Sequence, residues 1–156
     1  MILKTDIKHY ADLSKDELYG ILALRTSVFV VEQNCPYQEL DSKDQEAYHL
    51  ILRDSSEILG TLRILLTEYN INNPIIFIGR VVTHTSIRGK KWGHHIMNTS
   101  LQFIDEKWKN AHVIISAQEH LQTFYKKHGF ISTDKHYLED GIPHVEMHLN
   151  LKNYEV

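Results

Sequence analysis

The feature that most constrains the fold is the largely apolar run IIFIGRVVTH at residues 75–84. A run this rich in β-branched residues predicts a strand that is buried on both faces. The residues that follow, about 89–108, place Ile96, Met97, Leu101, Ile104 and Trp108 along one helical stripe. A buried strand that leads into an amphipathic helix predicts an α/β fold with helices packed on a sheet.

The rest of the chain supplies further elements of the same kind. Ser14 and Glu17 form a capping-box pattern at the start of a helix that Cys35 and Pro36 end. Gly129 is a natural C-cap for a later helix. We see no repeat or linker, so we expect a single domain over residues 1–156, with a mixed central sheet flanked by helices. The expected helices are 13–33, 89–108 and 119–128, and the expected strands are 4–9, 48–54, 57–69, 75–84, 112–117, 130–139 and 144–151.

Composition excludes several classes of function. The formal net charge is −3, which argues against nucleic acid or an anionic membrane as a partner. The single cysteine excludes an intramolecular disulfide and a four-cysteine zinc site. We expect no signal peptide and no membrane span, and therefore a cytoplasmic protein. The sequence leaves the oligomeric state open, a homodimer included.

A basic turn joins the buried strand to the helix. Its residues are Arg88, Gly89, Lys90, Lys91, Trp92 and Gly93. The first turn of a helix carries backbone N–H groups without intrahelical partners and a partial positive charge, so it binds phosphate groups well. Glycines let a ligand approach the backbone closely. The turn matches neither the nucleoside-triphosphate loop nor the dinucleotide fingerprint, which disfavours a nucleotide-binding module. From this segment alone, a pyrophosphate site and a solvated basic turn stay open.

A second segment, FYKKHGF at residues 124–130, places Tyr125 four residues before Gly129. Together with the strand, the basic turn and the order of elements, it resembles the GCN5-related N-acetyltransferase (GNAT) family. The blocks RTSVFVVEQNCPYQELD, RGKKWGHHIM, HLQTFYKKHGF and EDGIPHVEM resemble its ElaA-type subfamily. The chain departs from the broader family at Lys91, where a glycine is usual, and at Gln118 and Leu121, where many relatives have Asn and Ala.

The resemblance implies an acetyl-CoA site with no metal. The pantetheine arm would pair with the backbone of Arg80, Val81 and Val82, like an added strand. The pyrophosphate would lie on the turn at residues 88–93, and Gln118 would complete the cofactor-binding set. A backbone N–H near Val82 would polarise the thioester carbonyl.

The same resemblance implies direct acetyl transfer to a primary amine in a ternary complex. Tyr125 would serve as the acid that protonates the departing thiolate. No carboxylate marks the general base on the central strand, so the candidates come from loops: Glu32, His49 and His144. We place His144 first, because the resemblance puts the segment GIPH beside the acceptor cleft.

Other interpretations of single residues are weaker. Cys35 beside a proline is typical of a small buried hydrophobe, and a family that transfers directly does not need it as a nucleophile. His94 and His95 are neighbours on a helix and point about 100° apart. His144 and His148 lie far apart along a strand for chelation. These spacings argue against a metal site.

The acceptor is the least defined part of the hypothesis. A small-molecule amine or an exposed lysine fits the reaction, and a catalytically weak acyl-CoA-binding or regulatory domain is the alternative. Two loops expected near the cleft, residues 38–46 and 138–144, are acidic. We expect them to form a negative rim that favours cationic amines. Their charged residues are Glu39, Asp41, Lys43, Asp44, Glu46, Glu139 and Asp140.

Overall fold

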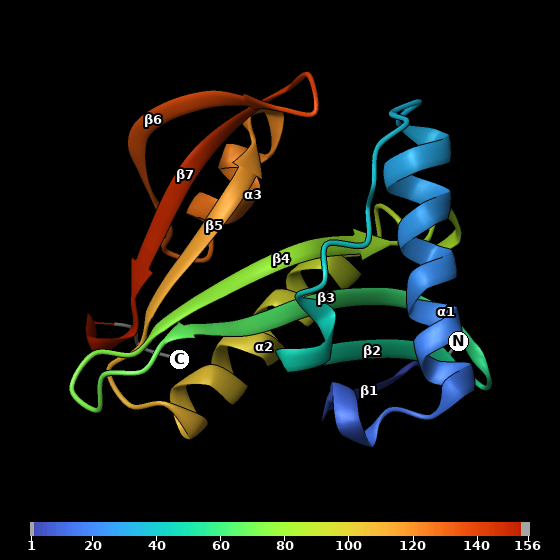
Figure 1. Cartoon of the computed structure of the whole chain (residues 1–156), viewed down its shortest axis with the longest axis horizontal. Helices are drawn as coiled ribbons and strands as arrows, with labels where there is room; N and C mark the ends of the chain where they lie inside the picture. The colour runs from blue at the N-terminus through green and yellow to red at the C-terminus, as the bar shows by residue number, and fades with distance from the viewer. Residues whose placement is uncertain (1, 154–156) are drawn as a thin grey trace. The chain divides into compact units, whose positions relative to one another are not determined.

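The computed structural model describes residues 2–153 of the chain. It contains one seven-stranded sheet with the order β1-β2-β3-β4-β5-β7-β6, flanked by helices (Figure 1). The β4–β5 pair is parallel, and the pairs β1–β2, β2–β3, β5–β7 and β6–β7 are antiparallel. The mixed α/β fold expected from the sequence is therefore confirmed. The strands are β1 Lys4–His9, β2 Tyr48–Asp54, β3 Glu57–Glu68, β4 Ile75–Thr83, β5 His112–Gln118, β6 Ile131–Glu139 and β7 Ile142–Asn150.

Three α-helices and several shorter turns connect the strands. The α-helices are α1 Lys15–Arg25, α2 Trp92–Lys107 and α3 Gln122–Lys126, and a π-helical segment, Thr26–Glu32, continues α1. Single 3₁₀ turns occupy Tyr10–Asp12, Asp44–Glu46, Thr85–Ile87, Glu119–Leu121 and Leu151–Asn153. The chain forms two compact units, one of residues 1–65 and 80–96 and the other of residues 66–79 and 97–156.

The first unit is built on the packing of α1 against the sheet. Its core contains Ile21, Leu24 and Val28 from the helical segment, together with side chains of β2, β3 and β4. Helix and sheet approach closely at Gly20, where a Cβ would lie 2.8 Å from Ile58 Cδ1. The capping box is confirmed, because Ser14 Oγ accepts from the Glu17 N–H at 3.0 Å and the Glu17 carboxylate accepts from the Ser14 N–H at 2.9 Å.

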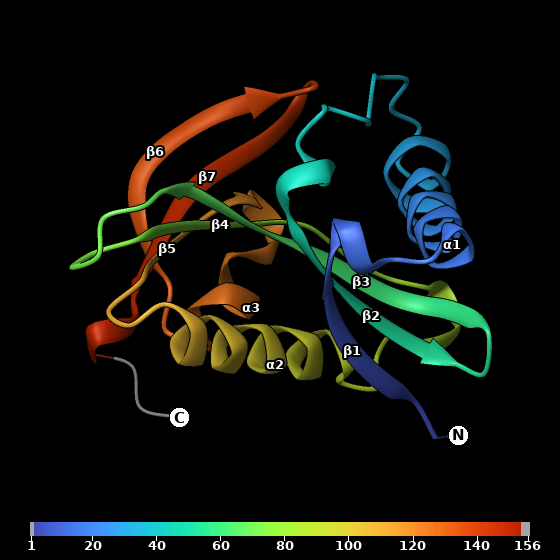
Figure 2. The same cartoon turned by 60° about the horizontal axis from the view of Figure 1, so that its bottom comes forward.

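The second unit is built on the three-stranded part β5-β7-β6, whose strands run side by side in Figure 2. Side chains alternate between its two faces. One face is buried and apolar, with Val113, Ile115 and Ala117 on β5 and Val145, Met147 and Leu149 on β7. The other face carries Ser116, Gln118, Tyr137 and His144, which the register places opposite one another in pairs or as near neighbours. The side chains of this second face can therefore form hydrogen bonds.

Helix boundaries differ from the sequence-based expectation in two places. Helix α2 begins at Trp92 rather than near Gly89, because Gly89 and Lys91 have φ values of +76° and +66° that no α-helix accepts. The helix expected over 119–128 is shorter, with a 3₁₀ turn followed by α3 Gln122–Lys126. Gly129 has φ +93°, as expected for a residue that ends a helix.

Candidate active site

The basic turn before α2 has a defined backbone shape. Gly89 adopts φ +76°, and a Cβ there would meet no atom within 4 Å, so conformation rather than crowding requires glycine. Lys91 adopts φ +66° although it carries a side chain, which costs roughly 1–2 kcal/mol. Two left-handed residues in this turn direct the chain into the N-terminus of α2. In the first turn of a helix, backbone N–H groups lack intrahelical partners and can bind an anion.

The cations of the turn lie at the surface. Arg88, Lys90 and Lys91 are exposed. The Arg88 guanidinium donates to the Thr83 carbonyl at 3.2 Å and forms an ion pair with Glu32 at 2.9 Å. Exposed ion pairs of this kind contribute little to stability, so a ligand phosphate can replace Glu32 at low cost. An exposed, positively charged turn before a helix N-terminus is suited to binding a phosphate group.

Strand β4 changes conformation at Arg80. Its pairing with β5 runs from Ile75 opposite His112 to Ile78 opposite Ile115. Arg80, two residues later, has φ +54°. A left-handed non-glycine residue inside a strand is strained and redirects the backbone groups that follow it. The residues that follow Arg80 are Val81 and Val82, which are predicted to bind the pantetheine arm.

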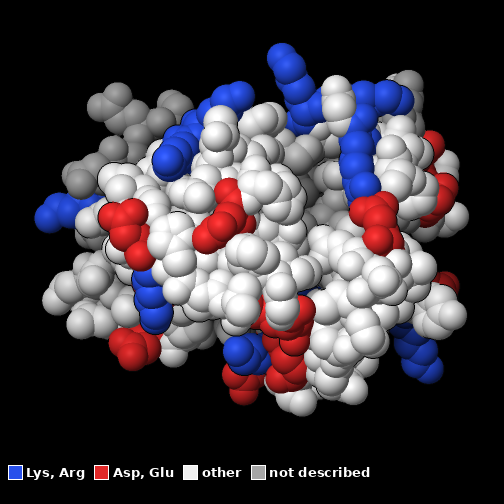
Figure 3. Space-filling view, turned by 90° about the horizontal axis from the view of Figure 1, so that it is seen from above, with Lys and Arg blue, Asp and Glu red and all other residues white. Residues whose placement is uncertain are grey.

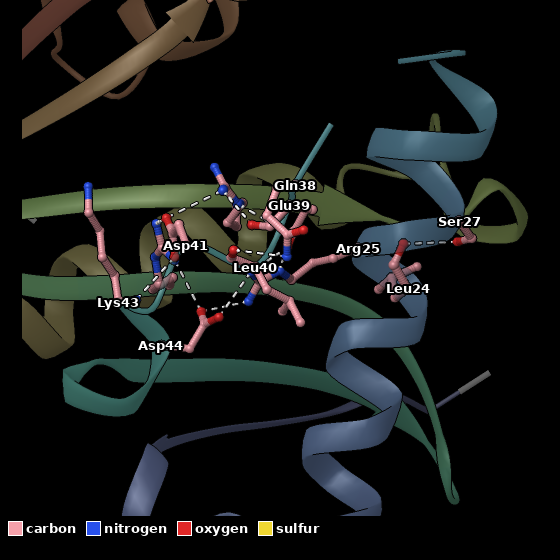
Figure 4. Close-up of polar contacts among 11 residues, drawn as sticks. Leu24, Arg25, Ser27, Gln38, Glu39, Leu40, Asp41, Lys43 and Asp44 are labelled. Atoms are coloured by element: carbon pink, nitrogen blue, oxygen red, sulfur yellow. Dashed lines mark hydrogen bonds and ion pairs between the residues drawn. The ribbon is translucent and has the colours of Figure 1, made fainter. Parts of the chain in front are cut away.

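The side chain of Arg80 belongs to a buried network of ions. Arg25 reaches from α1 to Glu39 and Asp44, and Asp41 lies beside them on the same loop (Figure 4). Arg25 contacts Glu39 at 2.5 and 2.8 Å and Asp44 at 2.7 and 3.2 Å. The network joins three arginines, Arg25, Arg63 and Arg80, to three carboxylates, Glu39, Asp41 and Asp44.

This network corrects the expected acidic rim. Burial alone would raise the pKa of Asp41, but Arg63, which binds both carboxylate oxygens at 2.8 Å, and Arg80 hold it at about 2. Burial opposes the charge of Asp44 in the same way, and Arg25 and Arg63 lower its pKa nonetheless. The charges of Glu39, Asp41 and Asp44 are thus neutralised by arginines, whereas Glu46, Glu139 and Asp140 of the expected rim are exposed. On the face visible in Figure 3, acidic and basic side chains form small separate groups rather than a rim of one sign.

Tyr125 lies on α3 and is 7% exposed. Its ring packs edge-on against Phe124 and Phe130, with ring centroids 5.0 and 6.0 Å away. Burial raises the pKa of its phenol to about 12. Within residues 2–153 its hydroxyl makes no hydrogen bond. Tyr125 therefore keeps its proton at neutral pH and can donate it in a hydrogen bond to a bound group.

The three candidates for the general base differ in their surroundings. Glu32 is paired with Arg88. His49 is 1% exposed and its Nε2 donates to the Asp44 carbonyl at 2.9 Å. Burial lowers the pKa of His49, so it is neutral and closed to solvent. His144 donates from Nδ1 to the Ile142 carbonyl at 2.7 Å, and its Nε2 lies 3.3 Å from the Glu139 carboxylate. Only His144 places a nitrogen beside an exposed carboxylate.

The second unit contains a cavity of about 450 Å³ that the sequence analysis did not foresee. Its lining residues are Glu119, His120, Gln122, Ile142 and Pro143. The Glu119 carboxylate lies 2.7 Å from Nδ1 of His136, an arrangement that orients an imidazole. A carboxylate at the start of a predicted helix, close to the end of a predicted strand, was the available signal. The partner on β6 is seventeen residues away, and a single sequence does not reveal that pairing.

Comparison with known proteins decides the family. The model of the acetyltransferase (GNAT) domain matches residues 10–151. The chain belongs to the GNAT acetyltransferase family. It is 40% identical to the protein ElaA of Escherichia coli over 141 residues, 89% of this chain and 91% of that one. This confirms the resemblance stated from the sequence.

Solved structures of GNAT proteins agree with this assignment. An acyl-CoA N-acyltransferase from Pseudomonas aeruginosa superposes with a TM-score of 0.87 at 42% identity, covering 94% of this chain and 99% of that one. Escherichia coli ElaA gives a TM-score of 0.86 at 37% identity with the same coverage. Family membership supports transferase activity with an acyl-CoA co-substrate.

Within residues 2–153, no group of three or more His, Cys, Asp or Glu residues is placed to hold a metal ion. In the same part of the chain, no helix has the length and apolar character that a membrane span requires.

Proposed function

We propose that this protein transfers an acetyl group from acetyl-CoA to a primary amine by direct attack in a ternary complex. The observation that carries the proposal is the left-handed, basic turn at residues 88–91 immediately before α2. Its three cations are exposed, and the helix N-terminus adds a partial positive charge. We assign the diphosphate of acetyl-CoA to this turn, with Trp92 and Gly93 in the first turn of the helix.

We assign the pantetheine arm to the backbone of Arg80, Val81 and Val82. The strained φ of Arg80 supports this assignment, since it changes the direction of the N–H and C=O groups that follow. Gln118, at the end of β5, is the further cofactor-binding residue in the proposal. A backbone N–H near Val82 would stabilise the oxyanion that forms when the thioester carbonyl is attacked.

In the proposed reaction, the neutral amine attacks the thioester carbonyl carbon, a C–N bond forms, and the C–S bond breaks. The base takes a proton from the amine nitrogen, and the departing thiolate takes a proton from water. A phenol with a pKa of about 12 holds its proton more tightly than a thiol with a pKa of about 8.5. Tyr125 therefore acts on the departing sulfur mainly as a hydrogen-bond donor that lowers the barrier to C–S cleavage.

We propose that the acceptor amine enters the cavity lined by Glu119 and Pro143. The carboxylate of Glu119 suits an ammonium group, and the cavity accommodates a small amine or a lysine side chain. His144, with Nε2 3.3 Å from Glu139, is the proposed base that removes the proton of the amine. His136 on Glu119 is the second candidate, favoured by its 2.7 Å contact and its place beside the cavity.

Two matched variants separate these histidines. His144→Gln should lower kcat, because the group that accepts the proton of the amine is lost. His136→Gln should leave kcat near the wild-type value. The opposite result would assign the base to His136, and wild-type kcat in both variants would exclude both.

The alternative function is a catalytically weak acyl-CoA-binding or regulatory domain. Calorimetry with acetyl-CoA, followed by a thiol-release assay with a panel of cationic, neutral and anionic amines, distinguishes the two. The proposed enzyme binds acetyl-CoA and releases thiol only when an acceptor is present. Tight binding without release for any amine would support the alternative, and absence of binding would overturn both.

A further inference from the structure

Arg80 adopts a strained backbone conformation that neither its residue type nor its place in a strand explains. Its φ of +54° lies in the region that glycine prefers, and it sits inside β4 rather than in a turn. Asparagine and aspartate reach this region with the help of their own short side chains, whereas arginine has no such help. Strain of this kind persists only where the surrounding structure over-determines it.

The surrounding structure holds the Arg80 side chain at its far end. Its Nη2 donates to the Glu39 carbonyl at 2.9 Å and lies 3.4 Å from Asp41 Oδ2. Its Nε lies 3.2 Å from Glu39 Oε1 in a charge contact without hydrogen-bond geometry. The side chain is 22% exposed, so these contacts are partly shielded from water.

The groups that hold Arg80 are themselves fixed. Arg25, 1% exposed, binds both carboxylate oxygens of Glu39. Arg63 binds both oxygens of Asp41 at 2.8 Å. Glu39 and Asp41 therefore cannot follow the guanidinium to a different place. If the backbone of Arg80 relaxed to an extended conformation, its side chain would leave these acceptors.

We infer that Arg80 is a positioning residue: the Arg25–Glu39–Asp41–Arg63 cluster clamps its guanidinium and thereby holds the left-handed backbone of β4. The clamp sets the direction of the Val81 and Val82 backbone groups. In this assignment the side chain of Arg80 touches neither acyl-CoA nor the acceptor, and it acts through the backbone. The part of the inference that concerns ligand binding rests on the proposed function, whereas the part that concerns backbone conformation does not.

A comparison of Arg80→Ala with Arg80→Gly tests the inference. Both variants lose the clamp, but only glycine adopts φ +54° without a Cβ penalty. We expect Arg80→Gly to melt at a higher temperature than Arg80→Ala, which reverses the usual order in a strand interior. Arg53→Ala, which removes ion pairs to Asp6 and Glu17 in the same unit, is the matched control with unchanged affinity for acetyl-CoA.

The ligand readout is the dissociation constant of acetyl-CoA by calorimetry. Arg80→Ala should raise it about tenfold, in line with the strain that the clamp offsets. Arg80→Gly should recover most of that loss. Equal losses of acetyl-CoA affinity in the two variants would show that the guanidinium itself contributes to binding. Wild-type affinity in Arg80→Ala would show that the clamp does not affect binding. Either result overturns the inference.

Two readouts keep the test informative if a variant folds poorly or the proposed function fails. Asp41→Asn keeps the shape of the clamp and removes one of its charges, and it should speed amide hydrogen exchange at Val81 and Val82. Unaltered exchange there would contradict the clamp. If the wild-type protein binds no acetyl-CoA, the proposed function fails, while the melting order of Arg80→Gly and Arg80→Ala still decides the conformational part. Melting of Arg80→Ala at or above Arg80→Gly overturns it.

Discussion

Single residues carry much of the geometry of this site through backbone conformation. Lys91 occupies a left-handed position, φ +66°, in the turn before α2. A lysine there offers charge to a phosphate at the expense of backbone strain, whereas a glycine would offer close approach without strain. Lys91 therefore adds a positive charge to the turn but lowers the stability of the fold. That loss of stability can be measured.

We predict that Lys91→Gly raises the free energy of unfolding by about 1 kcal/mol, because the Cβ penalty of the left-handed conformation disappears. Chemical denaturation measures this change. Lys90→Gly is the control: Lys90 has an ordinary φ, so glycine there should lower stability through the added entropy of the unfolded chain. Equal effects of the two substitutions would contradict the strain at Lys91.

We predict that Tyr125→Phe lowers kcat about 10²–10³-fold with little change in the affinity for acetyl-CoA, since a hydrogen bond to the departing sulfur exists mainly in the transition state. Tyr19→Phe, at an exposed position, should turn over at the wild-type rate. Because burial raises the Tyr125 pKa to about 12, Tyr125 should keep its proton, and its ionisation should cause no loss of activity up to about pH 10. A wild-type rate for Tyr125→Phe, with the chemical step rate-limiting, would exclude this role.

At the level of elements, the turn at residues 88–91 joins β4 to α2 and gathers the charge for a phosphate. We predict that Arg88→Ala combined with Lys91→Ala weakens acetyl-CoA binding at least tenfold, since each charge-assisted contact contributes roughly 1.5–3 kcal/mol. Both side chains are exposed, so the fold should be retained. The matched control is Lys15→Ala with Lys109→Ala, which removes the same charge from exposed positions elsewhere. A similar loss in both double variants would indicate a general charge effect instead.

The sequence predicted the elements well, because their signals are local. The capping box at Ser14 and the strand at residues 75–84 depend on neighbours in the chain. The conformations of Arg80 and Lys91 were not predictable, since arginine and lysine give no left-handed signal. The burial of Glu39 was also missed, because its partner Arg25 lies fourteen residues away on α1. Charge-rich segments normally predict solvated loops. Here the ion pair between Glu39 and the distant Arg25 buries part of such a segment instead.

At the scale of the whole molecule, the buried carboxylates make stability depend on pH. The pKa of Asp41 is about 2 in the folded protein, below its ordinary value of 3.8, and that of Glu17 is about 2 against 4.5. The unfolded chain therefore binds more protons than the folded one between about pH 5 and pH 2. Stability contributed by these groups is complete above that window and is lost as the pH falls through it.

We predict that the urea midpoint falls steadily as the pH is lowered from about 5 to about 2. In Asp41→Asn, which lacks one of these titrating groups, the midpoint should start lower and fall less steeply. A midpoint independent of pH in this range would contradict the proposed charge state of the network.

The central claim is acetyl transfer from acetyl-CoA to an amine, and it is tested most directly by measuring both products of one reaction. Free CoA and acetylated amine are quantified by mass spectrometry after incubation with acetyl-CoA and each member of an amine panel, including a lysine peptide. The proposed function predicts that, for at least one amine, the two products form in a ratio of about one to one and that Tyr125→Phe lowers both together. Release of CoA without acetylated amine, or formation of neither product with any amine, would contradict it.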